Sequence, residues 1–253
     1  MADLRFASLR LEKGGRAILN GVDGVLTHGR ITAILGPNGA GKSSLLHCLA
    51  GLEVPTGGDV TLGGTLLSAL SAQDRARSLG FLPQRAELHW NMAVRALVEL
   101  GRLVHSGGTR LTSDDAAIVD AVMADMDVAE LSQRPIWTLS GGEQARVLLG
   151  RVLAGQPEWL IADEPLASLD PAHQISVLRK MEAVARAGAG VALVLHDVNH
   201  AARIADDVLL MKDGSIVAHG PATAVLTPEI LQNVFDVPFR RIVGETAFLI
   251  GDS

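Results

Sequence analysis

The stretch Gly36-Pro37-Asn38-Gly39-Ala40-Gly41-Lys42-Ser43 decides the fold, because it fits the pattern G-x-x-x-x-G-K-[ST] in full. The apolar run Ile31–Leu35 before it predicts a short buried strand, and residues 44–50 after it predict a helix. Glycines at this place let backbone N–H groups approach phosphate oxygens, and the N-terminus of the helix adds partial positive charge. We therefore expect a phosphate-binding loop between a strand and a helix.

The side chains of this loop have separate expected roles. Lys42 should reach the β- and γ-phosphates of a nucleotide, and the hydroxyl of Ser43 should ligate Mg²⁺. The nucleotide-binding residues predicted from the loop are Gly36, Pro37, Asn38, Gly39, Ala40, Gly41, Lys42, Ser43 and Ser44. The pattern alone leaves kinases, GTPases and ATPases open, although the chain lacks the N-K-x-D motif by which GTPases read their base.

Length and composition restrict the class of protein further. The chain has 253 residues, is 48% hydrophobic and carries a net charge of −6, which suits one large α/β domain or a core with one inserted subdomain. No apolar run reaches the ~18–20 residues of a membrane span and no signal peptide opens the sequence, so we expect a soluble chain. Lys and Arg form no run, so nucleic acid is not an expected partner. The single cysteine, Cys48, excludes a disulfide framework and should pack as a small apolar residue.

The apolar pattern divides the chain into a core and an insertion. Short apolar segments in the first thirty residues and the pair Gly63-Gly64 predict antiparallel strands and a hairpin. Residues 87–153 are predominantly helical in pattern, whereas residues 159–162 and 190–195 are typical of buried parallel strands. The expected fold is α/β, a P-loop NTPase (RecA-like) core with an N-terminal antiparallel β-subdomain and an inserted α-helical subdomain. The core should comprise residues 1–86 and 154–222, the helical insertion residues 87–153, and a short C-terminal tail residues 223–253.

Two carboxylates, Asp163 and Glu164, directly follow the predicted strand 159–162. In open α/β sheets ligands bind beyond the carboxyl ends of the strands, which is where these side chains would emerge. Asp163 should hold Mg²⁺ through water, and Glu164 should polarise the attacking water. Acidic residues are also common at the start of a helix, but their combination with a phosphate loop favours the catalytic interpretation.

A second glycine-rich helix start occurs at Leu139-Ser140-Gly141-Gly142-Glu143. Ser140 and Glu143 form an S-x-x-E capping box. A cap does not explain two consecutive glycines, which weaken the first turn of a helix by roughly 1 kcal/mol each. The close approach of an anion to the bare backbone would explain both of them.

These motifs together resemble the nucleotide-binding subunit of ABC transporters. Residues 139–143 stand at the place of the signature motif of that family, and residues 159–165 match its Walker B motif with the catalytic glutamate. Gln84 matches the Q-loop glutamine, Asp170 the aspartate of the D-loop Ser168-Leu-Asp170, and His196 the switch histidine. With the phosphate loop, the motifs occur in the order of the family over residues 30–200.

The resemblance implies an active site shared by two copies that dock head to tail, with ATP and Mg²⁺ bound between them. Each ATP would lie between the phosphate loop of one copy and Ser140, Gly141 and Gly142 of the other. The catalytic residues that it implies are Glu164, His196, Gln84 and Asp170. The Mg²⁺-binding residues that it implies are Ser43, Gln84 and Asp163. Asp170 would brace the two opposed halves, and Gln84 would sense Mg²⁺-ATP at the junction with the helical insertion.

The resemblance also implies membrane partners. These are polytopic permease subunits and, indirectly, a periplasmic or extracellular substrate-binding protein, with this chain peripheral at the cytoplasmic face of the inner membrane. The C-terminal segment 226–235 and an expected strand at 246–250 are most similar to importers of iron–siderophore complexes, haem and vitamin B12. We expect an iron-chelate or haem importer. The alternatives are an importer of B12 or another metal complex, an exporter, and a non-transport ABC ATPase acting on DNA or ribosomes.

One position departs from the pattern of the family. Lys13 stands where members usually have an aromatic residue that stacks on adenine, and the chain contains no tyrosine. A cation over the base, supplied by Lys13 or Arg16, is one alternative. Two solvated surface charges are the other, and the sequence leaves both open.

Overall fold

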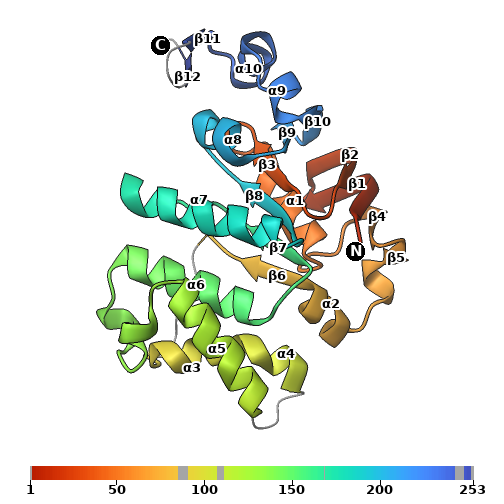
Figure 1. Cartoon of the computed structure of the whole chain (residues 1–253). Helices are drawn as coiled ribbons and strands as arrows, with labels where there is room; N and C mark the ends of the chain where they lie inside the picture. Colours follow the sequence, from red (N-terminus) through yellow and green to blue (C-terminus); the bar gives the residue numbers. More distant parts are fainter. Residues whose placement is uncertain (1, 85–90, 107–110, 168, 243–247, 252–253) are drawn as a thin grey trace.

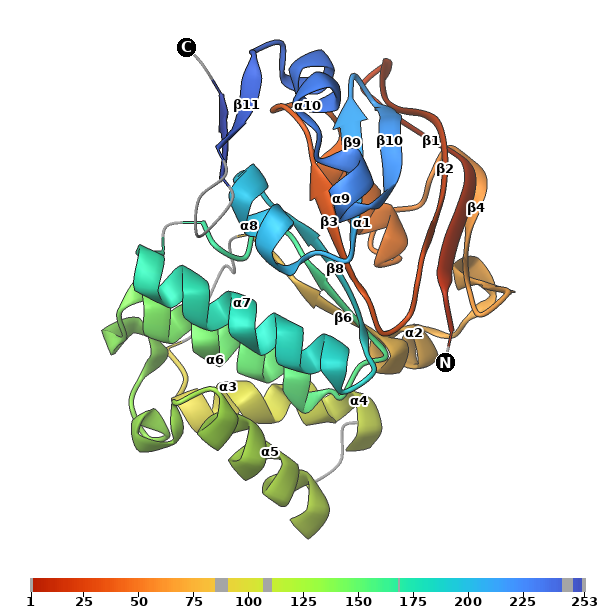
Figure 2. The same ribbon diagram turned by 45° about the horizontal axis from the view of Figure 1, so that its top comes forward.

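The computed structural model describes residues 2–84, 91–106, 111–167, 169–242 and 248–251. Figures 1 and 2 show two layers of β-structure at one end of the molecule and a group of helices, α3 to α6, at the other. The predicted fold class is therefore confirmed. The proposed border between core and insertion at residues 86 and 87 lies outside the described residues.

A six-stranded sheet forms the centre of the core, with the strand order β10-β9-β3-β8-β7-β6. Its neighbours pair in parallel except for the hairpin of β9 and β10. The strands are β3 (Ile31–Leu35), β6 (Leu79–Leu82), β7 (Trp159–Ala162), β8 (Gly190–Val194), β9 (Asp207–Lys212) and β10 (Ser215–Pro221). Every residue of β3, β7 and β8 is buried, as expected for parallel strands that are covered on both faces.

A second, antiparallel sheet with the order β2-β1-β4-β5 lies beside helix α1 (Figure 2). Its strands are β1 (Leu4–Lys13), β2 (Arg16–Leu26), β4 (Gly57–Leu62) and β5 (Thr65–Leu66). The predicted hairpin at Gly63-Gly64 joins β4 to β5, and both glycines have the positive φ that such a turn requires. Helix α1 (Lys42–Leu49) fills the space between the two sheets with Leu45, Leu46 and Leu49. Cys48 is buried in the same cluster, where burial raises its pKa to about 11.

The remaining helices belong to the core, to the group α3 to α6 and to the C-terminal tail (Figure 1). They are α2 (Ala72–Ser78), α3 (Val94–Glu99), α4 (Leu103–Ser106), α5 (Ser113–Asp125), α6 (Gly141–Ala154), α7 (Pro171–Arg186), α8 (Val198–Ile204), α9 (Ala222–Val225) and α10 (Pro228–Phe235). One apolar cluster runs from the sheet through α7 into α3, α5 and α6. The tail ends in a hairpin of β11 (Phe239–Ile242) and β12 (Phe248–Gly251), and β12 overlaps the expected terminal strand. Among the described residues, no helix has the length and apolarity that crossing a bilayer requires.

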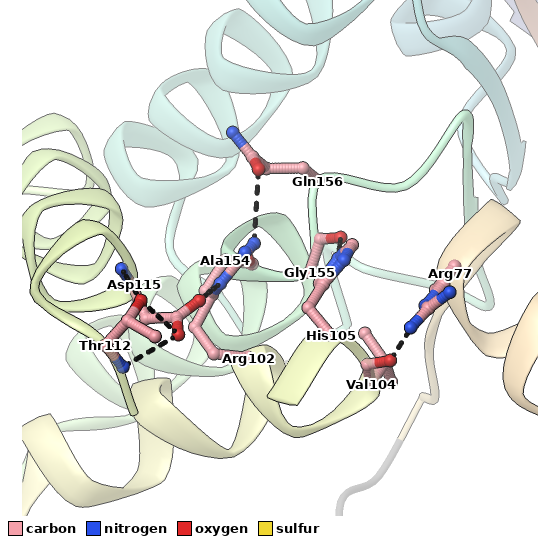
Figure 3. Close-up of polar contacts among 9 residues, drawn as sticks. All are labelled: Arg77, Arg102, Val104, His105, Thr112, Asp115, Ala154, Gly155 and Gln156. Carbon is pink, nitrogen blue, oxygen red and sulfur yellow. Dashed lines mark hydrogen bonds and ion pairs between the residues drawn. The ribbon is translucent and has the colours of Figure 1, made fainter. Parts of the chain in front are cut away.

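A buried arginine joins the helices of the insertion (Figure 3). Arg102 is 6% exposed and donates from Nε to Oδ1 of Asp115 over 2.8 Å. Its Nη1 donates to the carbonyl oxygen of Ala154 over 2.7 Å and to Oε1 of Gln156 over 3.1 Å. Asp115 also accepts from the backbone N–H and the hydroxyl of Thr112, so it caps α5 as well. Hydrogen bonds from Thr112 and Arg102 lower the pKa of Asp115 to about 2.

The same region attaches α6 to the core. The Nε2 atom of His105 lies 2.8 Å from the carbonyl oxygen of Gly155, next to the bond from Arg102 to Ala154. The last carbonyls of a helix lack partners within the helix, and these two side chains supply them. The carbonyl oxygen of Val104, the residue before His105, accepts from Nε of Arg77 on α2 over 2.9 Å. The C-terminal end of α6 is thus bound by Arg102 and His105 of the insertion, and the neighbouring Val104 is bonded to α2.

Replacing Arg102 with Met should lower the melting temperature by about 10 °C, because it leaves a buried carboxylate without its ionic partner. Since the folded-state pKa of Asp115 is depressed, the ion pair stabilises the fold above the ordinary carboxyl pKa of about 4 and is lost as the pH falls further. The difference in melting temperature should therefore be full at about pH 7 and should narrow below about pH 4. Calorimetry measures this difference in melting temperature. The control is Arg77→Met, which loses an exposed hydrogen bond to Val104. Equal melting temperatures of Arg102→Met and the original chain at neutral pH would contradict this role.

Candidate functional site

The phosphate loop is held by backbone from two different strands. A Cβ on Gly36 would lie 2.1 Å from the carbonyl oxygen of Met211 on β9, and one on Gly41 would lie 2.8 Å from that of Ile18 on β2. Both glycines also have positive φ values, +151° and +96°. Gly39 has φ +81° but no neighbour within 4 Å of its Cβ position. Hence Gly36 and Gly41 are required by packing against protein backbone, and Gly39 is the one that leaves space for a ligand.

A cavity of about 460 Å³ opens above this loop. Its lining comprises Arg16, Ala17, Ile18, Asn38, Gly39, Ala40, Gly41, Lys42, Ser43, Ser44, Glu164, Asp213 and Gly214. Predicted loop residues from Asn38 to Ser44 therefore face the cavity, whereas Gly36 and Pro37 do not line it. Its polar lining and its position at the N-terminus of α1 suit a polyphosphate.

Lys42 is the first residue of α1 and is only 6% exposed. Its Nζ donates to the carbonyl oxygen of Gly36 over 2.8 Å and to that of Pro37 over 3.0 Å. Burial lowers the pKa of Lys42, and the nearby carboxylates of Glu164 and Asp163 act in the opposite direction. An ammonium has three N–H donors, so one remains for a phosphate oxygen. Gly36 and Pro37 thus orient the lysine toward the cavity through their carbonyl groups.

Ser43 and Asp163 meet beside the loop, with 3.0 Å between Oγ and Oδ1. Asp163 is 5% exposed, and burial raises its pKa. A hydroxyl and a buried carboxylate are hard oxygen ligands that suit Mg²⁺, whose charge would favour the ionised carboxylate. No group of three His, Cys, Asp or Glu side chains among the described residues could hold a metal ion. Mg²⁺ at this site would therefore depend on phosphate oxygens and water as well.

Three of the predicted catalytic side chains converge at Glu164. Its Oε1 lies 2.6 Å from Nε2 of His196, and its Oε2 accepts a hydrogen bond from Nε2 of Gln84. These residues follow the adjacent strands β7, β8 and β6, so the parallel order of the sheet brings them together. The backbone of Glu164 has φ +48°, a left-handed conformation that is costly for a residue with a Cβ. The strained residue is therefore the one whose carboxylate has to point into the cavity.

Two other predicted elements lie away from this cavity. Ser140 caps α6 through the predicted box: its Oγ accepts from the N–H of Glu143, and Glu143 Oε2 accepts from the N–H of Ser140 over 2.7 Å. Ser140 and Gly141 are exposed, and neither they nor Gly142 line the cavity. Asp170 is also exposed and caps α7, while Ser168 lies outside the described residues. The phosphate loop of the chain is therefore not completed by its own second glycine-rich motif.

The structure distinguishes Lys13 from Arg16, the two residues that the sequence left open as a cation over the base. Nζ of Lys13 lies 2.8 Å from Oε2 of Glu53, and Lys13 does not line the cavity. Arg16 does line it, at the start of β2. Sequence reasoning missed Asp213 and Gly214, which line the cavity too. The Asp-Gly pair is typical of the turn that joins β9 to β10, but nothing in the sequence indicates that this turn packs on the phosphate loop.

The chain is similar to known proteins in sequence and in fold. The model of the ABC transporter family matches residues 19–167. The hemin import ATP-binding protein HmuV of Streptomyces coelicolor is 46% identical over 231 residues, which cover 91% of this chain and 82% of that protein. HmuV of Pseudomonas fluorescens is 45% identical, with 92% of both chains covered. The cobalamin import ATP-binding protein BtuD of Halobacterium salinarum is 39% identical over 92% of this chain but only 58% of its own length.

Solved structures share the fold. A proposed ABC transporter of the metal-chelate type in an inward-facing conformation superposes with a TM-score of 0.87 at 24% identity, covering 100% of this chain and 98% of that one. A bacterial Atm1-family ABC exporter with ATP bound gives a TM-score of 0.77 at 26% identity, covering 89% of this chain and 39% of that one. The fold is thus shared with an ABC transporter of the metal-chelate type and with an ABC exporter.

Replacing Arg16 with Ala should weaken ATP binding by about fivefold, the size of one cation–π contact with the base. Binding of tripolyphosphate, which has no base, should stay unchanged. Titration of the two ligands by calorimetry measures both affinities, and Lys13→Ala is the matched control that removes a cation outside the cavity. If Arg16→Ala weakens the binding of ATP and of tripolyphosphate equally, Arg16 acts only through its charge. If it weakens the binding of neither ligand, Arg16 is a solvated surface charge.

Proposed function

Because this chain belongs to the ABC transporter family, we propose that it is the ATP-hydrolysing subunit of an importer for haem or another iron chelate. The observation that carries the proposal is the similarity to hemin import ATP-binding proteins along more than nine-tenths of the chain. The similarity to a cobalamin import protein supports the alternative cargo, although it covers a smaller share of that protein. ATP is the substrate of the chain in either case.

In the proposed mechanism, Lys42 and the loop from Asn38 to Ser44 bind the phosphates, and Ser43 and Asp163 hold Mg²⁺. Mg²⁺ supplies neutralisation of phosphate charge when it is bound. Glu164 orients the attacking water and accepts its proton. His196 and Gln84 contact that carboxylate in this structure, so they are placed to fix its direction. Hydrolysis then depends on positioning and charge more than on covalent chemistry.

We further propose that two copies dock head to tail to complete each site. The support is that Ser140 and Gly141 are exposed and do not reach the cavity of their own chain. The free N–H groups at the start of α6 would contact the γ-phosphate bound by the other copy. Asp170 would brace the interface. The other proposed partners are permease subunits in the membrane and, through them, a substrate-binding protein, with this chain peripheral at the cytoplasmic face of the inner membrane.

Replacing Glu164 with Gln should lower ATP turnover by at least about a hundredfold, because it removes the general base. With hydrolysis blocked, ATP should hold two copies together. Size-exclusion chromatography with light scattering measures the dimer, and a phosphate-release assay measures turnover. Glu158→Gln is the matched control, because Glu158 is an exposed acid whose carboxylate accepts from the hydroxyl of Ser78 and does not line the cavity. A Glu164→Gln chain that stays monomeric at saturating ATP would contradict the shared site.

Cells without this chain should lose uptake of radiolabelled haem, and the original sequence should restore it. Lys42→Ala should fail to restore it, because ATP binding loses a buried cation, a loss of at least about thirtyfold in affinity. Labelled cobalamin measured in the same cells is the control for cargo. Loss of cobalamin uptake alone would assign the alternative cargo. Unchanged uptake of both, with nucleic acid in the purified protein, would support the non-transport function.

A further inference from the structure

A histidine that the mechanism does not use stands between two of the proposed interface elements. Asp170 accepts a hydrogen bond from the backbone N–H of His173 over 3.0 Å. The Nδ1 atom of the His173 ring lies 2.7 Å from the other carboxylate oxygen, Oδ2. Both oxygens of Asp170 are thus bound by one residue, which fixes the direction in which the carboxylate points.

The opposite side of the same ring packs against the start of α6. A Cβ built on Gly142 would lie 2.6 Å from Cδ2, 2.8 Å from Cγ and 2.9 Å from Nε2 of His173. Real Cβ atoms do not approach other atoms so closely, so any larger residue at 142 would displace the ring. Gly141, by contrast, has no neighbour within 4 Å of its Cβ position. Gly141 is therefore open toward a ligand, and Gly142 is required by His173.

A second contact joins α7 to the helical insertion. Nζ of Lys180, two turns beyond His173, donates to the backbone carbonyl of Asp125 at the end of α5 and lies 3.4 Å from its Oδ1. Both views show α7 running alongside α6 (Figures 1 and 2). Although α7 follows the core strand β7 in the sequence, its side chains bind the insertion at two separate points.

We propose that His173 is a positioning residue that locks Asp170 to the start of α6, so that the two elements form one preassembled surface. The inference rests on the proposed function, in which both elements contact the second copy. A carboxylate fixed relative to Ser140 and Gly141 meets the partner in a single geometry, which removes the cost of ordering it during docking. A change at His173 therefore acts on closure of the dimer and on turnover, and leaves nucleotide binding by the single chain intact.

Two variants of His173 test the proposal, each made with the native Glu164 for turnover and with Glu164→Gln for trapping the dimer. His173→Ala should lower kcat about tenfold, the size of one hydrogen bond to a charged group. The ATP concentration that half-assembles the trapped dimer should rise by a similar factor. The affinity of the monomer for ATP should change by less than about twofold, because His173 does not line the cavity. His173→Asn should restore most of the activity, since its amide N–H can replace Nδ1 as the donor to Asp170.

Gly142→Ala provides a second, independent test. Alone it should reduce turnover, because its methyl group displaces the ring of His173. Combined with His173→Ala it should do no further harm, since the space for the methyl group is then free, and such coupling is expected only for residues in contact. Fully additive losses of turnover in the double variant would show that Gly142 serves the ligand and would overturn the proposal. Unchanged kcat and unchanged dimer assembly in His173→Ala would overturn it as well. Loss of activity in both His173 variants, matched by a fall in melting temperature, would reduce His173 to a structural cap and overturn it too. A Glu164→Gln chain with His173 intact that never dimerises would instead refute the proposed function.

Discussion

Close contact between backbone segments holds the phosphate loop, and the rest of the site depends on it. Gly36 lies against the carbonyl oxygen of Met211 and Gly41 against that of Ile18, so the loop is fixed between the six-stranded and the antiparallel sheet. These contacts leave Lys42 in a buried position where carbonyl groups of the loop orient its ammonium. A rigid loop of this kind presents its N–H groups without paying an ordering cost when phosphate binds. The antiparallel sheet is therefore part of the nucleotide site and more than a cover for the core.

The order of the parallel strands explains why residues so distant in sequence share one site. Gln84, Glu164 and His196 follow three neighbouring strands, and the phosphate loop follows the next one. Each strand ends at the same edge of the sheet, so the order alone delivers a glutamine, a carboxylate and an imidazole to one place. The left-handed backbone of Glu164 shows that the placement has an energetic cost. The strain is maintained because the chain is buried on both sides of Glu164. Strand β7 lies before this residue, and Pro165 and Leu166 follow it.

Sequence reasoning succeeded where a signal is local. The loop, the capping box at Ser140, the hairpin glycines and the buried parallel strands each carry their own pattern, and the structure contains all of them. It missed strand β6 and helix α2, because Leu79–Leu82 is a four-residue segment with a glycine and α2 buries none of its residues. It also could not choose between Lys13 and Arg16, since the choice depends on the ion pair of Lys13 with Glu53. The anion predicted beside Gly141 and Gly142 stays a prediction, and nothing in the sequence indicates that the ring of His173 lies against the Cβ position of Gly142.

Helix α6 is held differently at its two ends. Its C-terminal carbonyls are bound by Arg102 and His105, in a region that also holds α2 of the core. Its N-terminal end presents exposed Ser140 and Gly141, with no neighbour at the Cβ position of Gly141. The helix has 14 residues and so spans about 21 Å. At the N-terminal end, the contact described is the ring of His173 against Gly142. Because His173 also binds Asp170, the start of α6 and the start of α7 would meet a second copy together as one surface.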